Sequence, residues 1–280
     1  MPSLPTISEQ DVAAAKAHDG RPHGAFDAPE LAHEDAPLFD YFCRLGDDAL
    51  ILGQRLSEWC GHAPALEVDL SLANISLDLI GQATMLLGAA GGGDDGADAL
   101  AFRRDVLHFK NCMLVEQPNG DFARTMARQL LFSTYQLLNF QRLASSKDET
   151  LSAIAQKAVK EVAYHRDLAR DWVVRLGDGT EESERRMADG LDWCWRFIPE
   201  LFEVDETLEA LIERGIAPDP REFEAEYRGE LAAVLSEAGL EPPADQRPIL
   251  GGRRGHHSEH LGHLLAVMQY LPRAYPDAKW

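Results

Sequence analysis

The chain has 280 residues and a formal net charge of −20 at pH 7, and it is 45% hydrophobic and 26% charged. This charge argues against nucleic acid or an anionic membrane as the main partner, because both are bound through clustered lysine and arginine. Abundant leucine and alanine, with a modest share of β-branched residues, favour an all-α globular protein.

Residues 1–36 are polar and contain Gly, Pro and Asp throughout, so we expect a flexible arm ahead of a single helical domain at 37–280. The arm carries Glu30 and His33 at ExxH spacing, which we attribute to chance in such a segment. A signal peptide is not indicated, and no apolar run is expected to reach the length of a membrane span. We therefore expect a cytoplasmic protein. The four cysteines lack CxxC spacing and are expected to be buried thiols: Cys43, Cys60, Cys112 and Cys194.

Two long helices joined by a turn at 62–64 are predicted next. The first starts near Pro37, bends at Gly46 and continues to Cys60. The second covers about 66–90 and ends at a glycine-rich segment, 91–96, that we expect to be a flexible loop. A helix with two apolar stripes should be buried on two sides. The stripes are Leu66/Leu70/Ala73/Leu77/Ile80 and Val68/Leu72/Ile75/Leu79/Ala83.

A second pair of long helices is predicted after a turn at 115–121, which completes a four-helix bundle. Asp121 should cap the third helix, about 122–144, and Gly177 should close the fourth, 151–176. A fifth helix starts at Asp178 or Thr180. Additional C-terminal helices are expected at about 206–214, 220–238 and 258–271, with an irregular segment at 239–255.

Bundles of this kind often hold a carboxylate-bridged pair of iron ions, which needs a Glu from each of two helices and Glu-x-x-His from each of the other two. On the first helix the nearest substitute is Gln54, and on the second Asp78 is followed three residues later by Gly81. The third helix has no acidic residue. On the fourth, Val162 stands three residues before His165. These five positions are interpreted as vestiges of a lost di-iron site, and no metal or catalytic residue is expected in this chain.

The remaining polar residues of the bundle suggest structural hydrogen bonding, because buried polar groups need partners. Glu161 lies four residues before His165, which predicts a buried hydrogen-bonded pair. Asp78 and Gln82 share a face of the second helix, as an interior polar network or as a solvated stripe.

Two constellations near the C-terminus allow other chemistry. His256, His257, His260 and His263, with Glu259, form either a polar interface or a metal site. Just before them, Gly251–Gly255 carries Arg253 and Arg254, which form either an anion cradle for a phosphate or a flexible linker.

Five blocks of the sequence resemble a known family. They read LGDDALILGQRLSEWCGHAP, LANISLDLIGQA, LVEQPNGDFARTMARQ, AVKEVAYH and GGRRGHHSEHLGHLLAVMQYLPRAYP. In these blocks the chain resembles the PaaC-type subunit of bacterial phenylacetyl-CoA oxygenase from about Pro37 to Trp280.

The resemblance implies a ferritin-like, non-catalytic structural subunit of a multicomponent phenylacetyl-CoA 1,2-epoxidase in aerobic phenylacetate catabolism. It implies that the di-iron centre lies in a homologous catalytic partner subunit, with a small bridging subunit beside it. It also implies a reductase that supplies NADPH electrons through FAD and an iron–sulfur cluster. Phenylacetyl-CoA at the subunit interface, and a homo- or hetero-oligomer, are further expectations.

Two other hypotheses stay open from the residues alone. One is an independent ferritin-like metalloenzyme that uses Asp78, Glu161 and His165, or the histidine cluster. The other is a helical acyl-CoA-binding protein with Arg253 and Arg254 on phosphate.

Overall fold

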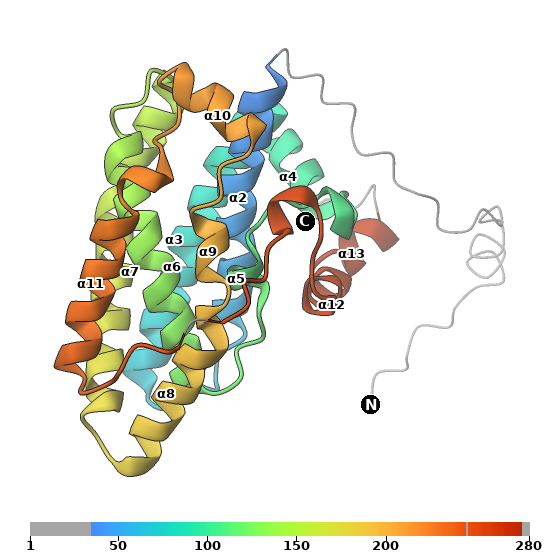
Figure 1. Ribbon diagram of the computed structural model, residues 1–280. Helices are drawn as coiled ribbons and strands as arrows, with labels where there is room; N and C mark the ends of the chain where they lie inside the picture. The colour runs from blue at the N-terminus through green and yellow to red at the C-terminus, as the bar shows by residue number, and fades with distance from the viewer. Residues whose placement is uncertain (1–34, 245, 276–280) are drawn as a thin grey trace, which may run out of the picture.

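The computed structural model describes residues 35–244 and 246–275, and in this part of the chain every regular element is a helix (Figure 1). Four long helices run side by side as two hairpins, and the contact of α3 with α7 joins them. Their bounds are α2 Ala36–Ser57, α3 Leu66–Gly91, α6 Phe122–Leu143 and α7 Glu149–Gly177. The expected all-α, ferritin-like four-helix bundle with additional C-terminal helices is therefore confirmed.

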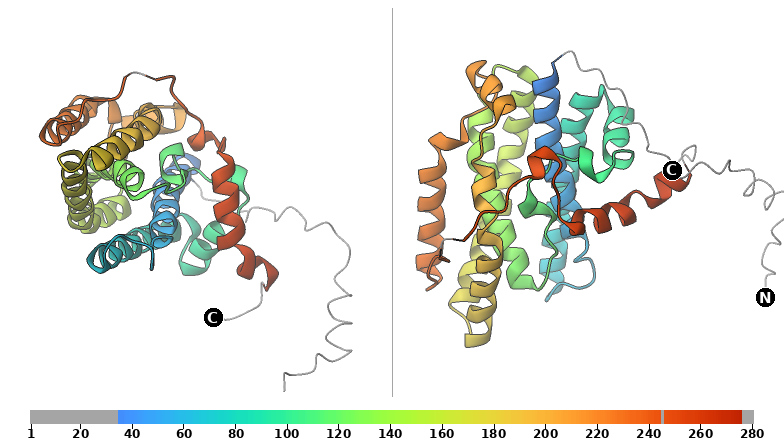
Figure 2. Two further views of the ribbon diagram at one scale, coloured as in Figure 1. Left: turned by 90° about the horizontal axis from the view of Figure 1, so that it is seen from below. Right: turned by 45° about the vertical axis from the view of Figure 1, so that its right-hand side comes forward.

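Shorter helices connect and cover the bundle. Between the hairpins lie α4 Asp94–Phe102, the 3-10 turn η1 Val106–His108 and α5 Met113–Glu116. After them come α8 Glu181–Trp195, α9 Ile198–Leu201, α10 Glu206–Glu213, η2 Pro220–Glu222 and α11 Glu224–Glu237. The chain closes with η3 Gly252–Arg254, α12 Glu259–Met268 and α13 Tyr270–Ala274, which project sideways from the bundle (Figure 2).

Local capping chemistry sets several helix starts where the sequence predicts them. The Asp121 side chain accepts the backbone N–H of Arg124 at 2.9 Å and starts α6. Thr180 caps α8 in a reciprocal arrangement with Ser183. In both cases a short side chain satisfies N–H groups that the first helical turn leaves unpaired.

The first hairpin differs from the prediction in several details. α2 runs straight through Gly46, because this glycine provides close contact: an added Cβ would lie 2.7 Å from Leu87 Cδ2. α2 ends at Ser57, so Cys60 lies beyond it and is exposed rather than buried. The expected glycine loop shrinks to residues 92–93, since α4 already begins at Asp94. Residues 1–34, including Glu30 and His33, lie outside the described residues.

Near the C-terminus, η2 ends at Glu222 and α11 begins at Glu224, so the single helix expected over 220–238 is interrupted. Pro272 lies inside α13, which corrects the expectation that it ends the last helix. Its position in the first turn explains the tolerance, because an N–H in that turn has no intrahelical partner to lose.

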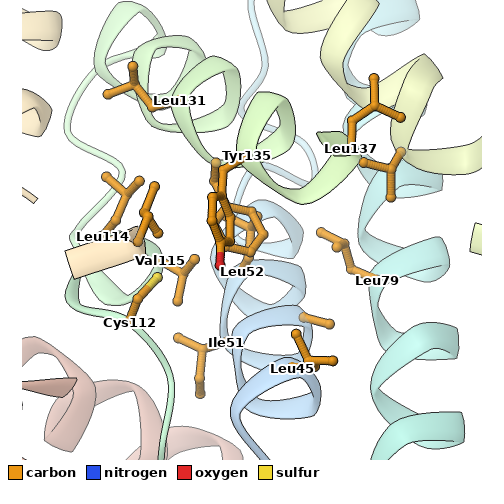
Figure 3. Packing of buried hydrophobic residues seen from close by; sticks show 14 of the residues in the cluster. Leu45, Ile51, Leu52, Leu79, Cys112, Leu114, Val115, Leu131, Tyr135 and Leu137 are labelled. Atoms are coloured by element: carbon orange, nitrogen blue, oxygen red, sulfur yellow. The ribbon is translucent and has the colours of Figure 1, made fainter. Parts of the chain in front are cut away.

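The core lies between the two hairpins and the segment around α5. Figure 3 shows Tyr135 of α6 pointing toward Leu52 of α2, with Cys112 and Val115 beside them. Leu79 of α3 closes the other side of this group. Aliphatic and aromatic side chains from all these elements fill one continuous buried cluster, which fixes the helices against each other.

Only one of the two apolar stripes on α3 is buried, which corrects the prediction of a helix covered on two sides. Val68, Leu72, Ile75 and Leu79 face the core, with at most 5% of each residue exposed. The other stripe is open: Leu66 is 71% exposed, Leu70 57% and Leu77 66%. Apolar periodicity therefore predicted the helix correctly and overstated its burial within this chain.

The expectation that no apolar run reaches membrane-span length is also wrong for α3. Its 26 residues have the length and mean hydropathy, 1.3, of a spanning helix, by length and composition alone. The core helix of a bundle meets the same test, and α3 packs against both α2 and α7. Asp78 and Gln82 on α3 also bond to side chains of α7, so α3 acts as a bundle helix.

Candidate functional site

The polar centre of the bundle lies where α3 and α7 run antiparallel. His165 Nε2 lies 3.0 Å from Asp78 Oδ2, and one turn away Gln82 Nε2 donates to Glu161 Oε2 at 3.0 Å. Gln136 of α6 extends the second group, because its Nε2 donates to Gln82 Oε1 at 3.1 Å. The result is an interior polar network that links three helices.

This network corrects the expected pairing of Glu161 with His165. Both residues belong to the polar centre, but the direct partner of His165 is Asp78 and that of Glu161 is Gln82. Contacts within one helix lose here to contacts across the interface, because α3 offers a partner at the same height for each residue of α7. The alternative of an interior network for Asp78 and Gln82 describes the arrangement.

Burial lowers the pKa of His165, and the hydrogen bond to Asp78 and its charge offset this only in part. The imidazole is therefore neutral near pH 7 and donates its Nε2 proton to the Asp78 carboxylate. Its Nδ1 atom is buried without a hydrogen-bond partner among the described residues. A neutral, singly bonded histidine of this kind holds two helices together and is not poised for proton transfer.

The other vestigial positions contribute no ligand to this centre. Gly81 lies on the exposed side of α3, and an added Cβ would meet no atom within 4 Å. A histidine at position 81 would therefore point to solvent, which corrects the interpretation of Gly81 as an inward ligand position. Val162 is fully buried and apolar, and Gln54 is half-buried on α2.

The side chains at the bundle centre do not fit a pair of iron ions. Such a pair takes four carboxylates and two histidines. Asp78, Glu161 and His165 are the ionisable residues of the network, and each carboxylate is already bonded to a side chain of the protein. In the described ranges, 35–244 and 246–275, no three His, Cys, Asp or Glu side chains converge as a metal site.

A second set of buried charges, which the sequence reasoning missed, surrounds the segment that leads into α5. Asp47 of α2 pairs with Arg104 and accepts the backbone N–H of Lys110 at 2.8 Å. Asp48 accepts the N–H of Cys112 at 2.7 Å. The available signal was a pair of adjacent aspartates on the apolar face of a predicted helix, since buried charges require partners.

The predicted anion cradle at Gly251–Gly255 exists, but the protein supplies its own anion. The backbone N–H groups of Gly251 and Gly252 donate to Glu200 Oε1 at 2.8 and 2.7 Å, and Met113 N–H donates to Glu200 Oε2 at 2.6 Å. Glu200 is buried, and burial raises its pKa while these donors and the charge of Arg253 lower it in part. The carboxylate replaces the phosphate that such a loop was predicted to bind.

Arg253 and Arg254 also differ from the expected phosphate contacts. Arg253 lies in the interior, where its Nη2 donates to Asp48 Oδ2 at 2.8 Å and its Nη1 to the Lys110 carbonyl at 2.9 Å. Arg254 is more exposed and donates to Glu203 Oε1 at 2.6 Å. A pocket of about 260 Å³ lies instead between the starts of α6 and α8, and neither arginine lines it.

The histidine cluster is divided by the start of α12. His256 and His263 are exposed, whereas the His257 side chain is fully buried against Glu116 of α5. His260 is half-buried, and its backbone carbonyl accepts a hydrogen bond from Arg55 at 3.0 Å. The four histidines therefore point to different surroundings.

The fold and this site define a helical-bundle protein of the carboxylate di-iron type whose bundle centre carries structural hydrogen bonds. A family model described as "Phenylacetic acid catabolic protein" matches residues 27–280, and the chain belongs to this family. It is 50% identical over 245 residues to the PaaC-type subunit of 1,2-phenylacetyl-CoA epoxidase from Escherichia coli (strain K12). The match covers 87% of this chain and 99% of that relative.

Proposed function

We propose that this chain is a structural, non-catalytic subunit of a cytoplasmic phenylacetyl-CoA 1,2-epoxidase, in which it supports a homologous di-iron subunit. The observation that carries the proposal is the bundle centre. The Asp78–His165 pair and the Glu161–Gln82–Gln136 chain stand where a catalytic bundle needs four carboxylates and two histidines. The similarity to the PaaC-type subunit of the bacterial epoxidase supports the same role.

The remaining components of the reaction are assigned to other chains in this proposal. The catalytic partner holds the iron, a small subunit bridges the assembly, and a reductase with FAD and an iron–sulfur cluster supplies electrons from NADPH. No cofactor is assigned to this chain. Phenylacetyl-CoA would approach it only at the interface with the catalytic subunit, and Arg253 would not hold the phosphates, because its guanidinium group is already bonded to Asp48.

The test is an iron count on the assembled complex. We expect Asp78→Asn combined with His165→Gln to leave the iron content and epoxidation rate of the complex unchanged within about twofold, because uncharged isosteres keep the α3–α7 contact and no iron depends on it. Iron is measured per chain by metal analysis, and epoxidation by dioxygen uptake.

The purified wild-type chain, incubated with ferrous iron and desalted, serves as the second measurement. Stoichiometric iron on the isolated chain, lost in the double variant, would refute a non-catalytic role and favour an independent metalloenzyme. Assembly of the complex by gel filtration controls for misfolding of the variant.

The exposed stripe of α3 is the surface that we assign to the partner subunit. Leu66, Leu70 and Leu77 lie on one side of a helix whose opposite side is packed in the core. A contiguous exposed apolar surface of this kind marks an interaction site more often than a solvated face. Figures 1 and 2 place α12 on another part of the molecule, which makes an exposed residue there a suitable comparison.

We expect Leu70→Asp and Leu77→Asp each to weaken association with the catalytic subunit by roughly ten- to hundredfold. The loss of one buried leucine, about 1.5–3 kcal/mol, corresponds to a change of this size. Val267→Asp on α12, which is 83% exposed, is the matched control and should leave association unchanged. Affinity is measured by co-purification and by titration of the purified subunits. Weakening by the control alone would assign the interface to α12 instead.

A further inference from the structure

The side chain of His257 is fully buried, and both of its ring nitrogens face oxygen acceptors. Nδ1 lies 2.7 Å from Glu116 Oε2, and Nε2 lies 2.9 Å from the backbone carbonyl oxygen of Phe109. A carbonyl oxygen accepts only, and so does an ionised carboxylate. A neutral imidazole carries one N–H group and would direct a lone pair at one of these oxygens, whereas an imidazolium donates to both.

The hydrogen bonds of Glu116 place the proton on His257 and not on the carboxyl group. Glu116 Oε2 also accepts from Asn111 Nδ2 at 2.9 Å, and Oε1 accepts from the backbone N–H of Ser258 at 2.7 Å. A proton on Oε2 would compete with Asn111 for the same oxygen, and a proton on Oε1 would face the Ser258 donor. The group is therefore a carboxylate with three donors.

The charges around this pair come from several elements. Arg55 of α2 donates to the backbone carbonyl of Glu116, from Nε at 3.1 Å and from Nη2 at 2.9 Å. Asp47, also on α2, adds a weaker attraction for a cation at His257. Arg104 stacks on the ring of Phe109, whose carbonyl group bonds His257, and its charge is taken up by Asp47.

The pair joins two segments that are distant in the sequence. Glu116 ends α5, and Ser258 is the residue that precedes the first turn of α12. Arg55 bonds both sides of the junction, since its Nη2 also donates to the carbonyl of His260 at 3.0 Å. The junction thus fixes the start of α12, which projects from the bundle (Figure 2).

We propose that His257 is a buried imidazolium that latches the start of α12 to α5, and that loss of its proton at alkaline pH loosens this junction. Deprotonation leaves a lone pair opposite either the Phe109 carbonyl or the Glu116 carboxylate, so that one hydrogen bond becomes a repulsion. Asp48–Arg253 and the Glu200 contacts continue to hold η3. The response is therefore confined to the η3–α12 junction.

Burial alone lowers the pKa of His257, but the hydrogen bond to Glu116 and its charge outweigh burial, so the pKa lies above its usual value. A group whose pKa is raised by folding stabilises the folded state fully below its unfolded pKa, about 6.5. The stabilisation is lost as the pH rises through the folded-state value. The pH window of the latch thus lies on the alkaline side of an ordinary histidine.

The test combines nitrogen NMR of the histidine rings with amide exchange on the full chain. At pH 7 we expect both His257 nitrogens to carry a proton. Between about pH 7 and pH 10 we expect the ring to deprotonate and the amide protection of residues 257–261 to fall at least about tenfold, since bonds to charged groups are the stronger class. Exchange rates are corrected for the intrinsic effect of pH.

His257→Gln should abolish this pH dependence, because an amide does not titrate and has no second donor group for the other acceptor. His256→Gln alters the exposed neighbour and should behave like the wild type. A neutral His257 at pH 7, or equal pH dependence in the wild type and His257→Gln, would overturn the proposal. If His257→Gln fails to fold, the ring NMR of the wild type still decides, because a single protonated nitrogen refutes the latch.

Discussion

Replacement of Asp47 by asparagine is expected to lower the free energy of unfolding by about 3–5 kcal/mol, the range for a buried ion pair that loses one partner. Asp47 is fully buried, and it receives Arg104 through both carboxylate oxygens as well as the N–H of Lys110. Asparagine keeps the shape but leaves the buried guanidinium without a counter-charge. The measurement is urea unfolding of the purified chain followed by circular dichroism.

Two comparisons make this result specific. Asp189→Asn removes one partner of an exposed pair with Arg185, and it should change the free energy of unfolding by no more than about 1 kcal/mol. Asp47→Leu combined with Arg104→Met replaces both charges and should recover much of the loss, because two apolar residues leave no orphaned ion. A loss for Asp47→Asn no greater than that of the exposed control would contradict the assignment of this pair as a structural anchor.

A second large effect is expected at Gly252, where the chain passes close to the segment before α5. An added Cβ would lie 2.2 Å from the backbone oxygen of Asn111 and 3.1 Å from the backbone nitrogen of Met113. Because both atoms belong to the main chain, neither can turn away. Gly252→Ala should therefore destabilise the chain by about 1–3 kcal/mol or more, and weaken the bond of Gly252 N–H to Glu200.

Gly262→Ala provides a glycine control with the opposite expected sign. Gly262 lies inside α12, and its added Cβ would find its nearest neighbour, Val106 Cγ2, at 3.9 Å. Alanine in a helix interior should stabilise by about 0.5–1 kcal/mol. Thermal unfolding of both variants is the measurement. Equal shifts of both variants in the same direction would show that the close approach at Gly252 does not limit stability.

The helices of the bundle follow from local sequence chemistry, and this part of the fold was predictable. Asp121 and Thr180 mark helix starts by accepting nearby backbone N–H groups, which requires residues only three apart. Apolar periodicity likewise indicated α3 and its core face. Periodicity reports that a face is apolar and carries no information on what covers it. The exposure of Leu70 and Leu77 therefore came from the arrangement of the helices.

The candidate site was predictable in its depletion of metal ligands and not in its contacts. Counting carboxylates on the predicted helices is enough to find a poor ligand set, because each ligand must come from a helix body. The partners of the surviving residues depend on which helices adjoin. His165 turned to Asp78, 87 residues away in sequence, rather than to Glu161 on its own helix.

The sequence by itself determined the helical elements, most of their caps and the absence of a complete di-iron ligand set on the predicted bundle helices. Only the tertiary structure decided that Glu200 fills the glycine cradle, that Arg253 pairs with Asp48 and that His257 meets Glu116. The physical reason is range. Capping and periodicity act within one or two helical turns, whereas a buried charge takes its partner from whichever distant segment packing brings within hydrogen-bond distance.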